Sequence, residues 1–415
     1  MVKDSLVKKT LLPLLLVSTF GLSACSTVSN WFADDEELEV RVLKPIEAQF
    51  TPQQVWSASL GEGVGDYFSR LRPALGYEMV FAANRQGRVV ALEQDSGKQV
   101  WSNNFAHFKD DSFTSVITNL WSSGVAAKIS GGLSVAYETL FFGTENGEVF
   151  ALDVHTGEQK WSVKVKGEVL AEPAIDEGVV VINTGSGLMF GLDAETGAQL
   201  WIYESDVPPL SLRGIASPVA ANGGAIIGTA SGKLAVNILG TGQTAWEQVI
   251  SSPTGATELD RIVDIDSQPL VAGGIIYVIS YDGSLASVEL RSGRVIWKRE
   301  YKSYRRLTAV GNTLFLVDAN SNVYALDSRN GIELWSQSAL KQRSLTSAVP
   351  VGDYLVAGDK WGYLHWFNQS DGKIVARLAV GGDDEDESIY SDPIVEDKVL
   401  YTQTRDGKLV AVQTP

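Results

Sequence analysis

Hydrophobic residues along this chain recur in short runs that are separated by glycine-containing turns. The clearest unit opens with Gly, continues through an apolar run, turns at a TG, SG, NG or DG pair, and ends at Trp. Six copies place Trp 14 positions after the opening residue: 87–101, 147–161, 187–201, 232–246, 283–297 and 321–335. A weaker copy, 362–376, ends in Ala376, and a fragment, 407–415, stops before its Trp. A period of this kind indicates one structural unit that is repeated along the chain.

Each copy predicts a β-hairpin, because its apolar runs have strand length and its Gly supplies the positive φ of a tight turn. Two further apolar runs precede each copy, as in 217–221 and 225–230, so one unit holds four antiparallel strands. Four-stranded units of 40 to 60 residues are typical of β-propeller blades. A β-sandwich or a β-solenoid is the alternative, but neither explains a Trp at the same position in six units.

The first and last apolar runs predict how the ring closes. The last unit lacks its fourth strand, while the run 52–60, with Trp56, has no partner strand beside it in the sequence. Pairing the two completes an eighth blade and leaves only short edges exposed. The expected fold is therefore all-β: an eight-bladed β-propeller of four-stranded antiparallel blades over residues 51–415, with the last blade closed by the N-terminal strand.

The first 50 residues are expected to lie outside the propeller. A basic start, a short apolar run and small residues make residues 1–24 a predicted signal peptide. The run is too short for a spanning helix. Leu22-Ser23-Ala24-Cys25 resembles a bacterial lipobox, which implies that Cys25 becomes the lipidated N-terminus and that residues 25–50 form a polar tether. Ser26, where Asp would favour inner-membrane retention, indicates the outer membrane.

Composition excludes several functions. Residues 1–24 hold three Lys and one Asp, so their removal moves the net charge from −16 to −18, which disfavours binding to nucleic acid. The chain has one Cys and three His without metal-ligand spacing, and we expect no metal site. It has no G-x-S-x-G, H-E-x-x-H or P-loop motif, so we expect a binding protein without catalytic residues or cofactor.

The repeat resembles the PQQ-like propeller repeat over nearly all of residues 54–415, with the pattern G-x-[LV]-x-A-L-[DE]-x-x-[TS]-G-x-x-x-W. Departures are Ser321 for the opening Gly, Ala376 for Trp, and the polar VNI of the fourth copy. The resemblance includes quinone-dependent dehydrogenases, which hold their cofactor and calcium near the axis beside a pair of adjacent cysteines. This chain has no such pair. A carbohydrate-binding propeller is the other alternative, but here the repeat itself takes up the tryptophans.

Several connections between blades are longer than the repeat requires, and all of them should lie at one end of the ring. They include 102–123, 202–216, 247–267 and 381–391. Long loops on one face of a repeat protein are typical binding elements. The acidic stretch 383–387 is interpreted as a solvated face.

The connections 202–216 and 247–267, the third and fourth links between consecutive blades, should be neighbours in space and carry the candidate site. The third has PPLSLRG at 208–214, and the fourth has ELDRIVDID at 258–266. The candidate partner-binding residues are Leu210, Leu212, Arg213, Asp264 and Asp266. An apolar anchor beside charges of both signs is typical of a protein–protein hot spot. Alternatively, the leucines pack under the loop and Arg213 pairs internally with Asp264 or Asp266.

The lipobox, the eight PQQ-like repeats and the two loop motifs together resemble the BamB family of outer-membrane lipoproteins. That resemblance implies a non-catalytic scaffold of the β-barrel assembly machinery. In it, the Leu-x-Leu-Arg and Asp-x-Asp loops contact the periplasmic POTRA domains of BamA. It also implies other subunits of the machinery as partners, and short sheet edges that could receive unfolded outer-membrane proteins. Membrane contact would be through the lipid anchor alone.

Overall fold

A computed structural model describes residues 39–106, 125–212, 216–254, 256–382 and 385–415. The chain forms two compact units, Met1–Pro45 and Ile46–Pro415, and of the first only residues 39–45 are described. Within these described ranges, none of the helices is long and apolar enough to cross a membrane.

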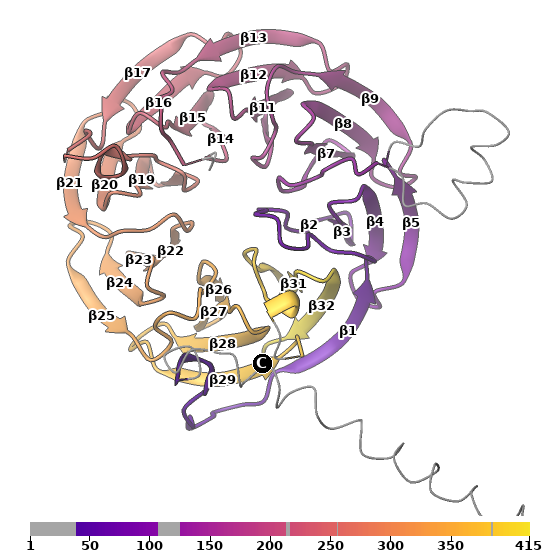
Figure 1. Cartoon of the computed structure of the whole chain (residues 1–415), viewed down its shortest axis with the longest axis vertical. Helices are drawn as coiled ribbons and strands as arrows, with labels where there is room; N and C mark the ends of the chain where they lie inside the picture. Colours follow the sequence, from indigo (N-terminus) through magenta and orange to yellow (C-terminus); the bar gives the residue numbers. More distant parts are fainter. Residues whose placement is uncertain (1–38, 107–124, 213–215, 255, 383–384) are drawn as a thin grey trace, which may run out of the picture. The chain divides into compact units, whose positions relative to one another are not determined.

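The second unit is a closed ring of eight antiparallel sheets with four strands each (Figure 1). Blades 1 to 4 are β2 (Ala74–Gly76), β3 (Met79–Ala83), β4 (Arg88–Glu93), β5 (Gln99–Asn104); β6 (Ser134–Ala136), β7 (Thr139–Gly143), β8 (Glu148–Asp153), β9 (Gln159–Lys164); β10 (Ala174–Asp176), β11 (Val179–Asn183), β12 (Leu188–Asp193), β13 (Gln199–Glu204); and β14 (Val219–Ala221), β15 (Gly224–Gly228), β16 (Lys233–Ile238), β17 (Thr244–Val249).

Blades 5 to 8 continue in the same order. They are β18 (Leu270–Ala272), β19 (Ile275–Ile279), β20 (Ser284–Glu289), β21 (Val295–Glu300); β22 (Thr308–Val310), β23 (Thr313–Val317), β24 (Val323–Asp327), β25 (Glu333–Gln337); β26 (Val349–Val351), β27 (Tyr354–Gly358), β28 (Tyr363–Asn368), β29 (Ile374–Ala379); and β30 (Ile394–Glu396), β31 (Val399–Gln403), β32 (Lys408–Gln413) with β1 (Gln53–Ser59).

The ring closes where the sequence predicts. Strand β1 pairs antiparallel with β32, so Trp56 faces Ala411, and in Figure 1 β1 lies beside the C-terminal strands. The prediction of an eight-bladed propeller closed by the N-terminal strand is confirmed. Residues 46–50, which precede the expected start of the propeller, pack on blade 7: the Gln49 N–H donates to the Val375 carbonyl at 2.8 Å.

Each blade buries its middle strands and exposes one side of its outer strand. The second strands of blades 1 to 4, such as MVFAA in β3, are buried along their whole length, and those of blades 5 to 8 at every residue but the first, because neighbouring blades cover both faces. In the outer strands β5, β9 and β13 the Trp is the only buried residue. The repeat pattern therefore records which side of each strand meets the next blade.

The repeated Trp joins each blade to the following one. The indole N–H of Trp101 donates to the Val154 carbonyl of blade 2 at 2.7 Å, and its ring covers the turn glycine Gly157. That glycine has a φ of +73°, and a Cβ on it would stand 2.7 Å from the indole. The same hydrogen bond to the next blade, between 2.7 and 3.0 Å, is made by Trp56, Trp161, Trp201, Trp246, Trp297 and Trp335.

Blade 7 makes the same junction with its two strands exchanged. In the other blades a smaller residue of the third strand faces the Trp of the outer strand, as Ala151 faces Trp161. In blade 7 the Trp is on the third strand, and Trp366 faces Ala376. The Trp366 indole N–H donates to the Thr414 hydroxyl of blade 8 at 3.0 Å. Phe50 packs edge-on against Trp366, with ring centroids 6.3 Å apart.

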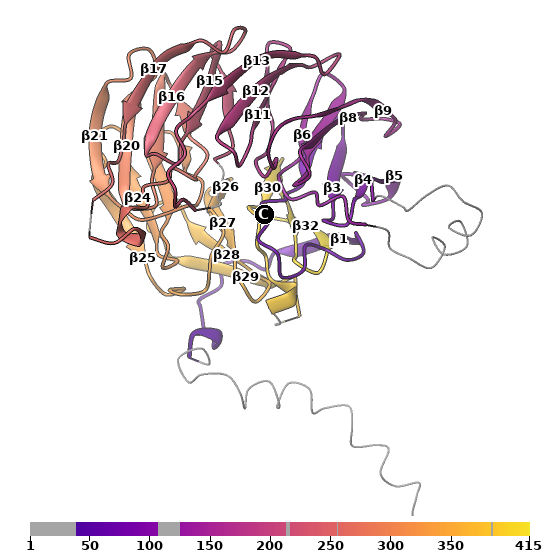
Figure 2. The same cartoon turned by 45° about the horizontal axis from the view of Figure 1, so that its top comes forward.

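Consecutive strands of a blade run in opposite directions, so each connection between blades begins and ends at the same end of the ring (Figure 2). We call this end the link face and number each link by the blade that it follows. Two short 3-10 helices lie on it, η1 (Leu259–Arg261) in the fourth link and η2 (Glu385–Glu387) in the seventh. Glu385 and Asp386, in the described part of the acidic stretch 383–387, are exposed.

Candidate protein-docking site

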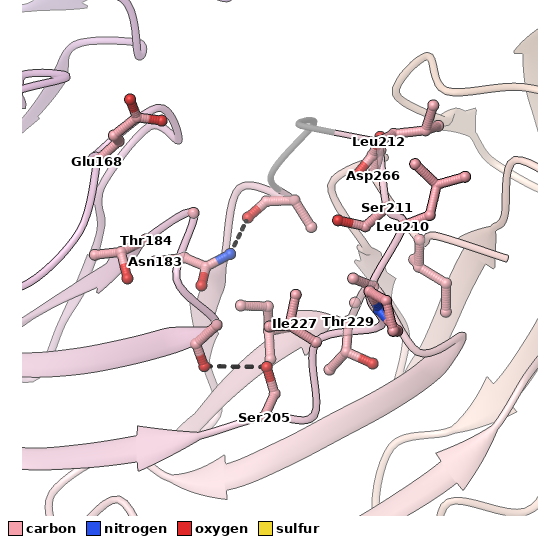
Figure 3. A pocket seen from close by; sticks show the side chains of 18 residues that line it. Glu168, Asn183, Thr184, Ser205, Leu210, Ser211, Leu212, Ile227, Thr229 and Asp266 are labelled. Carbon is pink, nitrogen blue, oxygen red and sulfur yellow. Dashed lines mark hydrogen bonds between the residues drawn. The ribbon is translucent and has the colours of Figure 1, made fainter. Parts of the chain in front are cut away.

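A cleft opens on the link face between blades 3 and 4 and has a volume of about 280 Å³. Figure 3 shows Leu210 and Leu212 on one side of it with Asp266, and Glu168 and Thr184 on the opposite side. The third and fourth links thus share one hollow, as expected for adjacent links. Leu212 and Asp266 are brought together from positions 54 residues apart in the sequence.

The third link, residues 205–218, keeps Leu210 on the surface. Pro208 and Pro209 remove two backbone donors and restrict φ, so this part of the chain cannot extend the sheet of blade 3. Leu210 is 41% exposed, and Leu212 is half-buried. The sequence left open whether the leucines are displayed to a partner or packed under the loop. In the structure Leu210 is exposed.

Hydrogen bonds anchor the third link on both sides of these leucines. The Ser205 N–H donates to the Gly187 carbonyl at 2.9 Å, and the Asn183 side-chain amide donates to the Ala216 carbonyl at 3.0 Å. An apolar side chain displayed from an anchored loop loses little conformational entropy when a partner covers it. This arrangement suits an interface anchor.

The fourth link carries its two aspartates in a buried segment. Residues 262–267 are all buried, and Ile265 packs so closely on Gly228 of blade 4 that a Cβ there would lie 2.2 Å from its Cγ2. The Tyr281 N–H donates to the Asp264 carbonyl at 2.9 Å. The sequence predicted charges around the apolar anchor. In the structure both carboxylates lie beneath it instead, because the flanking isoleucines and Val263 draw the segment into the core.

The electrostatics of this carboxylate pair are unusual. Burial, reinforced by the neighbouring Asp266, raises the pKa of Asp264 to about 7, and burial raises the pKa of Asp266 to about 6 against the opposing effect of Arg70. The backbone N–H groups of Leu212 and of Asp264 itself oppose the rise at Asp264, and among the described residues no side chain makes a hydrogen bond to either carboxylate oxygen of Asp264. A buried carboxylate with no described cation beside it is costly, so this position favours a proton or a cationic group.

Two candidate residues lie outside the described ranges. Arg213 follows Leu212 directly, and Cys25 belongs to the first 38 residues. The roles assigned to them from the sequence stay predictions.

A second hollow, the central cup, lies beside the first at the axis of the link face. Its volume is about 600 Å³. Leu212 and Asp266 line both hollows, so the two are continuous. The other wall of the cup is the eighth link, residues 60–73, with the exposed pair Tyr67 and Phe68.

Ion pairs cross the axis of the propeller. Arg72 contacts Glu172 at 2.8 Å, and Arg306 contacts Glu172 at 2.6 Å and Asp392 at 3.6 Å. Burial opposes ionisation of Glu172, but the two guanidinium groups outweigh it and lower its pKa to about 2. Two arginines and two carboxylates balance in charge, and they tie blades 1, 3, 6 and 8 together.

Sequence reasoning missed both the aromatic pair and the axial ion pairs. The axial residues could have been found, because each stands two positions before the first strand of its blade, as in Arg72-Pro73 and Glu172-Pro173. The aromatic pair has no comparable signal, since it precedes the first full repeat.

The fold and the repeat together define the class of this protein, a β-propeller of PQQ-like repeats. A family model described as "Outer membrane protein assembly factor BamB" matches residues 45–111, 118–337 and 319–414. The chain belongs to the BamB family, as the sequence motifs indicated.

Relatives of similar length support this assignment. The protein named outer membrane protein assembly factor BamB in Alteromonas naphthalenivorans is 58% identical over 399 residues, which cover 96% of this chain and 95% of that protein. The one so named in Escherichia coli strain K12 is 41% identical over 406 residues, covering 98% and 99%.

Two solved structures separate family from fold. BamB from Moraxella catarrhalis superposes with a TM-score of 0.75 at 29% identity, over 88% of this chain and 100% of that one. A quinohemoprotein alcohol dehydrogenase from Comamonas testosteroni reaches a TM-score of 0.65 at 12% identity, over 90% and 78%. The second likeness shows a shared fold only.

Proposed function

We propose that this protein is a non-catalytic, lipid-anchored scaffold of the outer-membrane β-barrel assembly machinery. It binds the periplasmic POTRA domains of BamA through Leu210, Leu212, Arg213, Asp264 and Asp266. The observation that carries the proposal is the anchored third link, which displays Leu210 beside a hollow that it shares with the fourth link. An accessible apolar anchor next to a pocket is the arrangement of protein–protein hot spots.

In this proposal the buried aspartates act from beneath the surface. Asp264 has raised affinity for a proton because it is buried and lies beside a second carboxylate, Asp266. A guanidinium group that reaches it, from Arg213 or from the partner, would form a charge-assisted hydrogen bond in a desolvated setting. Asp266 holds the adjacent position, with its backbone carbonyl accepting from Arg70 at 2.6 Å.

The proposed location in the cell envelope is based on the first 50 residues. Cys25 carries the lipid after removal of residues 1–24, residues 25–50 form the tether, and the propeller occupies the periplasm at the outer membrane. Other subunits of the machinery, and unfolded barrel precursors at sheet edges, are further partners in this proposal.

A quinone-dependent activity is not supported. The residues present do not fit that cofactor, because the chain has a single Cys in place of an adjacent pair. The axial region, where those enzymes hold their cofactor, is crossed here by the ion pairs of Arg72, Glu172, Arg306 and Asp392.

The proposal is tested with the double variant Leu212→Glu, Arg213→Glu in the full-length lipoprotein, followed by affinity purification from membranes. We expect BamA to be lost from the purified complex. The matched control is Ile332→Glu, Arg329→Glu at exposed residues of a turn on the opposite face, which should keep BamA. A folded double variant that still recovers BamA at the control level contradicts the proposal.

A further inference from the structure

We propose that the docking site continues across the propeller axis to a second wall, formed by Tyr67 and Phe68. One apolar side chain from the surface of a folded POTRA domain inserts into the central cup between this wall and Leu212. The inference rests on the proposed function and extends it. It assigns the eighth link to the interface and gives the partner a specific chemical feature.

Tyr67 and Phe68 are two adjacent aromatic side chains that are both largely exposed to solvent. Tyr67 is 59% exposed and Phe68 is 68% exposed. Exposed aromatic pairs at the edge of a hollow are typical of binding surfaces, because aromatic rings cover a large area with few rotatable bonds.

The exposure does not come from a frayed loop. The Val64 N–H donates to the Arg405 carbonyl at 2.9 Å before the aromatic pair, and the Arg70 N–H donates to the Ser130 carbonyl at 2.9 Å after it. The Arg405 guanidinium also donates to the Gly65 carbonyl at 2.6 Å. The eighth link is thus attached to blade 8 on one side and to the first link on the other.

The rings themselves are held in place. The Arg85 guanidinium lies 3.7 Å from the centre of the Tyr67 ring and pairs with Glu145 at 2.9 Å. A cation over an aromatic face stabilises the ring orientation. Arg70 lies 5.9 Å from the Phe68 ring in the same way. The cup is therefore largely formed before a partner arrives, which reduces the entropy lost on binding.

The lining favours an apolar occupant. Tyr67 and Phe68 face a hollow that Leu170, Leu212 and Tyr281 also line. The cup's arginines are already engaged, Arg85 with Glu145 and Arg70 with the Asp266 carbonyl. The lining also includes Glu168 and Lys128, one of each sign, so the cup has an apolar interior with mixed charges, as interface cores and rims do.

Continuity with the cleft between blades 3 and 4 identifies the occupant as part of the same partner. Leu212 lines both hollows, so a domain that covers Leu210 and Leu212 also covers the cup. The cup's volume of about 600 Å³ accommodates a large side chain with its backbone. A second copy of this chain is disfavoured, since each copy carries a net charge of −16.

The test uses the full chain in detergent and the purified POTRA region of BamA from the same organism. Dissociation constants are measured for wild type, Leu212→Ala, Phe68→Ala and Tyr67→Ala. We expect Phe68→Ala to weaken binding at least about tenfold and Tyr67→Ala by a smaller factor. Leu259→Ala is the control, because Leu259 is 72% exposed on the same face but outside the cup, and it should leave binding unchanged.

The outcomes separate the two proposals. If wild type binds, Leu212→Ala weakens binding and Phe68→Ala does not, the cup proposal is wrong and the proposed function stands. If wild type does not bind, the proposed function fails and the cup proposal fails with it. Thermal melting of Phe68→Ala should match wild type, because so exposed a ring contributes little to folding.

A second measurement identifies the occupant directly. Phe68→p-benzoylphenylalanine in the membrane-bound lipoprotein should crosslink to a POTRA domain of BamA on illumination. Crosslinks to an unfolded barrel precursor or to a second copy of this chain, in place of BamA, would overturn the proposal. The double variant Leu212→Ala, Phe68→Ala should lose less affinity than the two single changes combined, because both walls contact one inserted side chain.

Discussion

Blade 7 and the other blades solve the same packing problem in opposite ways. In blade 2 the small Ala151 lies on the third strand and Trp161 on the outer strand, while in blade 7 Trp366 lies on the third strand and Ala376 on the outer one. Both indoles donate a hydrogen bond to the following blade, at 3.0 Å in each case. The junction conserves one large and one small residue, and the strand that carries each is exchangeable.

The acceptors show why the exchange works. Regular tryptophans reach a backbone carbonyl just after the third strand of the next blade, as Trp161 reaches Ala194. Thr414 holds the equivalent place after β32, and Trp366, starting from the adjacent strand, meets its hydroxyl instead. Phe50 from the segment before β1 packs on the same indole. The exchange thus lies where the ring closes.

Removing either indole should produce the largest loss of stability. Trp161→Ala and Trp366→Ala are each expected to lower the free energy of unfolding by about 3–5 kcal/mol, because each empties a large buried volume and leaves an acceptor unpaired. Urea unfolding followed by circular dichroism measures the effect. If Trp366→Ala costs less than half as much as Trp161→Ala, the exchanged pair is not equivalent to the regular one. Restoring the regular order with Trp366→Ala, Ala376→Trp should recover part of the loss.

The turn glycines give the next largest effect and separate two causes. Gly197 has a φ of +73° and its Cβ position lies 2.8 Å from the Trp161 ring, whereas Gly223 has a φ of +71° with nothing within 4 Å. Gly223→Ala should therefore cost only the backbone strain, about 1 kcal/mol. Gly197→Ala should cost about 3 kcal/mol, because the indole must also move. Equal losses in urea unfolding would show that the indole contact adds nothing.

Much of the fold was predictable because the repeat carries it. The spacing from opening residue to Trp defines the hairpins, and the unpaired run around Trp56 defines the closure. The exchange in blade 7 was not predictable, since Ala376 reads as a lost Trp until the strand register places Trp366 opposite it. The sequence of a single repeat shows which residues each strand contains. The packing between two blades depends on which residues of neighbouring strands face one another, and the repeat alone does not show this.

The sequence predicted where the candidate site lies but not that its aspartates are buried. Adjacent links had to meet, and Leu212 and Asp266 do line one cleft. The burial of Asp264 follows from Val263 and Ile265 on either side of it, a run that loop composition alone would assign to the surface. Phe68 was not predictable because exposure at an axis depends on contacts between the eighth link and distant blades.

Asp264 and Asp359 are two buried carboxylates that differ in pairing, and a stability test distinguishes them. Asp264→Asn should raise the free energy of unfolding by about 2 kcal/mol at pH 8. The folded pKa of about 7 lies above the unfolded value of 3.8. Ionisation of Asp264 therefore destabilises the native state as the pH rises from the unfolded pKa to the folded pKa. The gain should shrink between pH 8 and pH 5 in thermal melts.

Asp359→Asn should be destabilising at both pH values. Burial opposes its ionisation, but hydrogen bonds and charges from His365 and Arg343 outweigh burial and lower its pKa. A loss of stability in Asp264→Asn at pH 8 would mean that a cation already pairs with that carboxylate in the full chain.

The smallest expected effect concerns the charged groups inside blade 7. His365 occupies the position that Phe150 and Phe190 hold in blades 2 and 3, and it is fully buried. Its Nε2 lies 2.8 Å from Asp359, and its Nδ1 accepts from the Arg377 guanidinium at 3.2 Å. The accepting Nδ1 assigns the neutral tautomer with the proton on Nε2.

Burial, helped by Arg377 and Arg343 against Asp359, lowers the pKa of His365. Below about pH 6.5 His365 therefore binds a proton in the unfolded chain but not in the folded chain. The free energy of unfolding consequently decreases as the pH is lowered, by at most about 1.4 kcal/mol per pH unit. His365→Gln can keep both hydrogen bonds without titrating. We expect it to lose about 1 kcal/mol less than wild type between pH 7 and pH 5.5 in urea unfolding. If the free energies of unfolding of wild type and His365→Gln changed with pH in parallel, His365 would be taking up its proton in the folded blade. Blade 7 would then be no more sensitive to acid than the blades that carry Phe at this position.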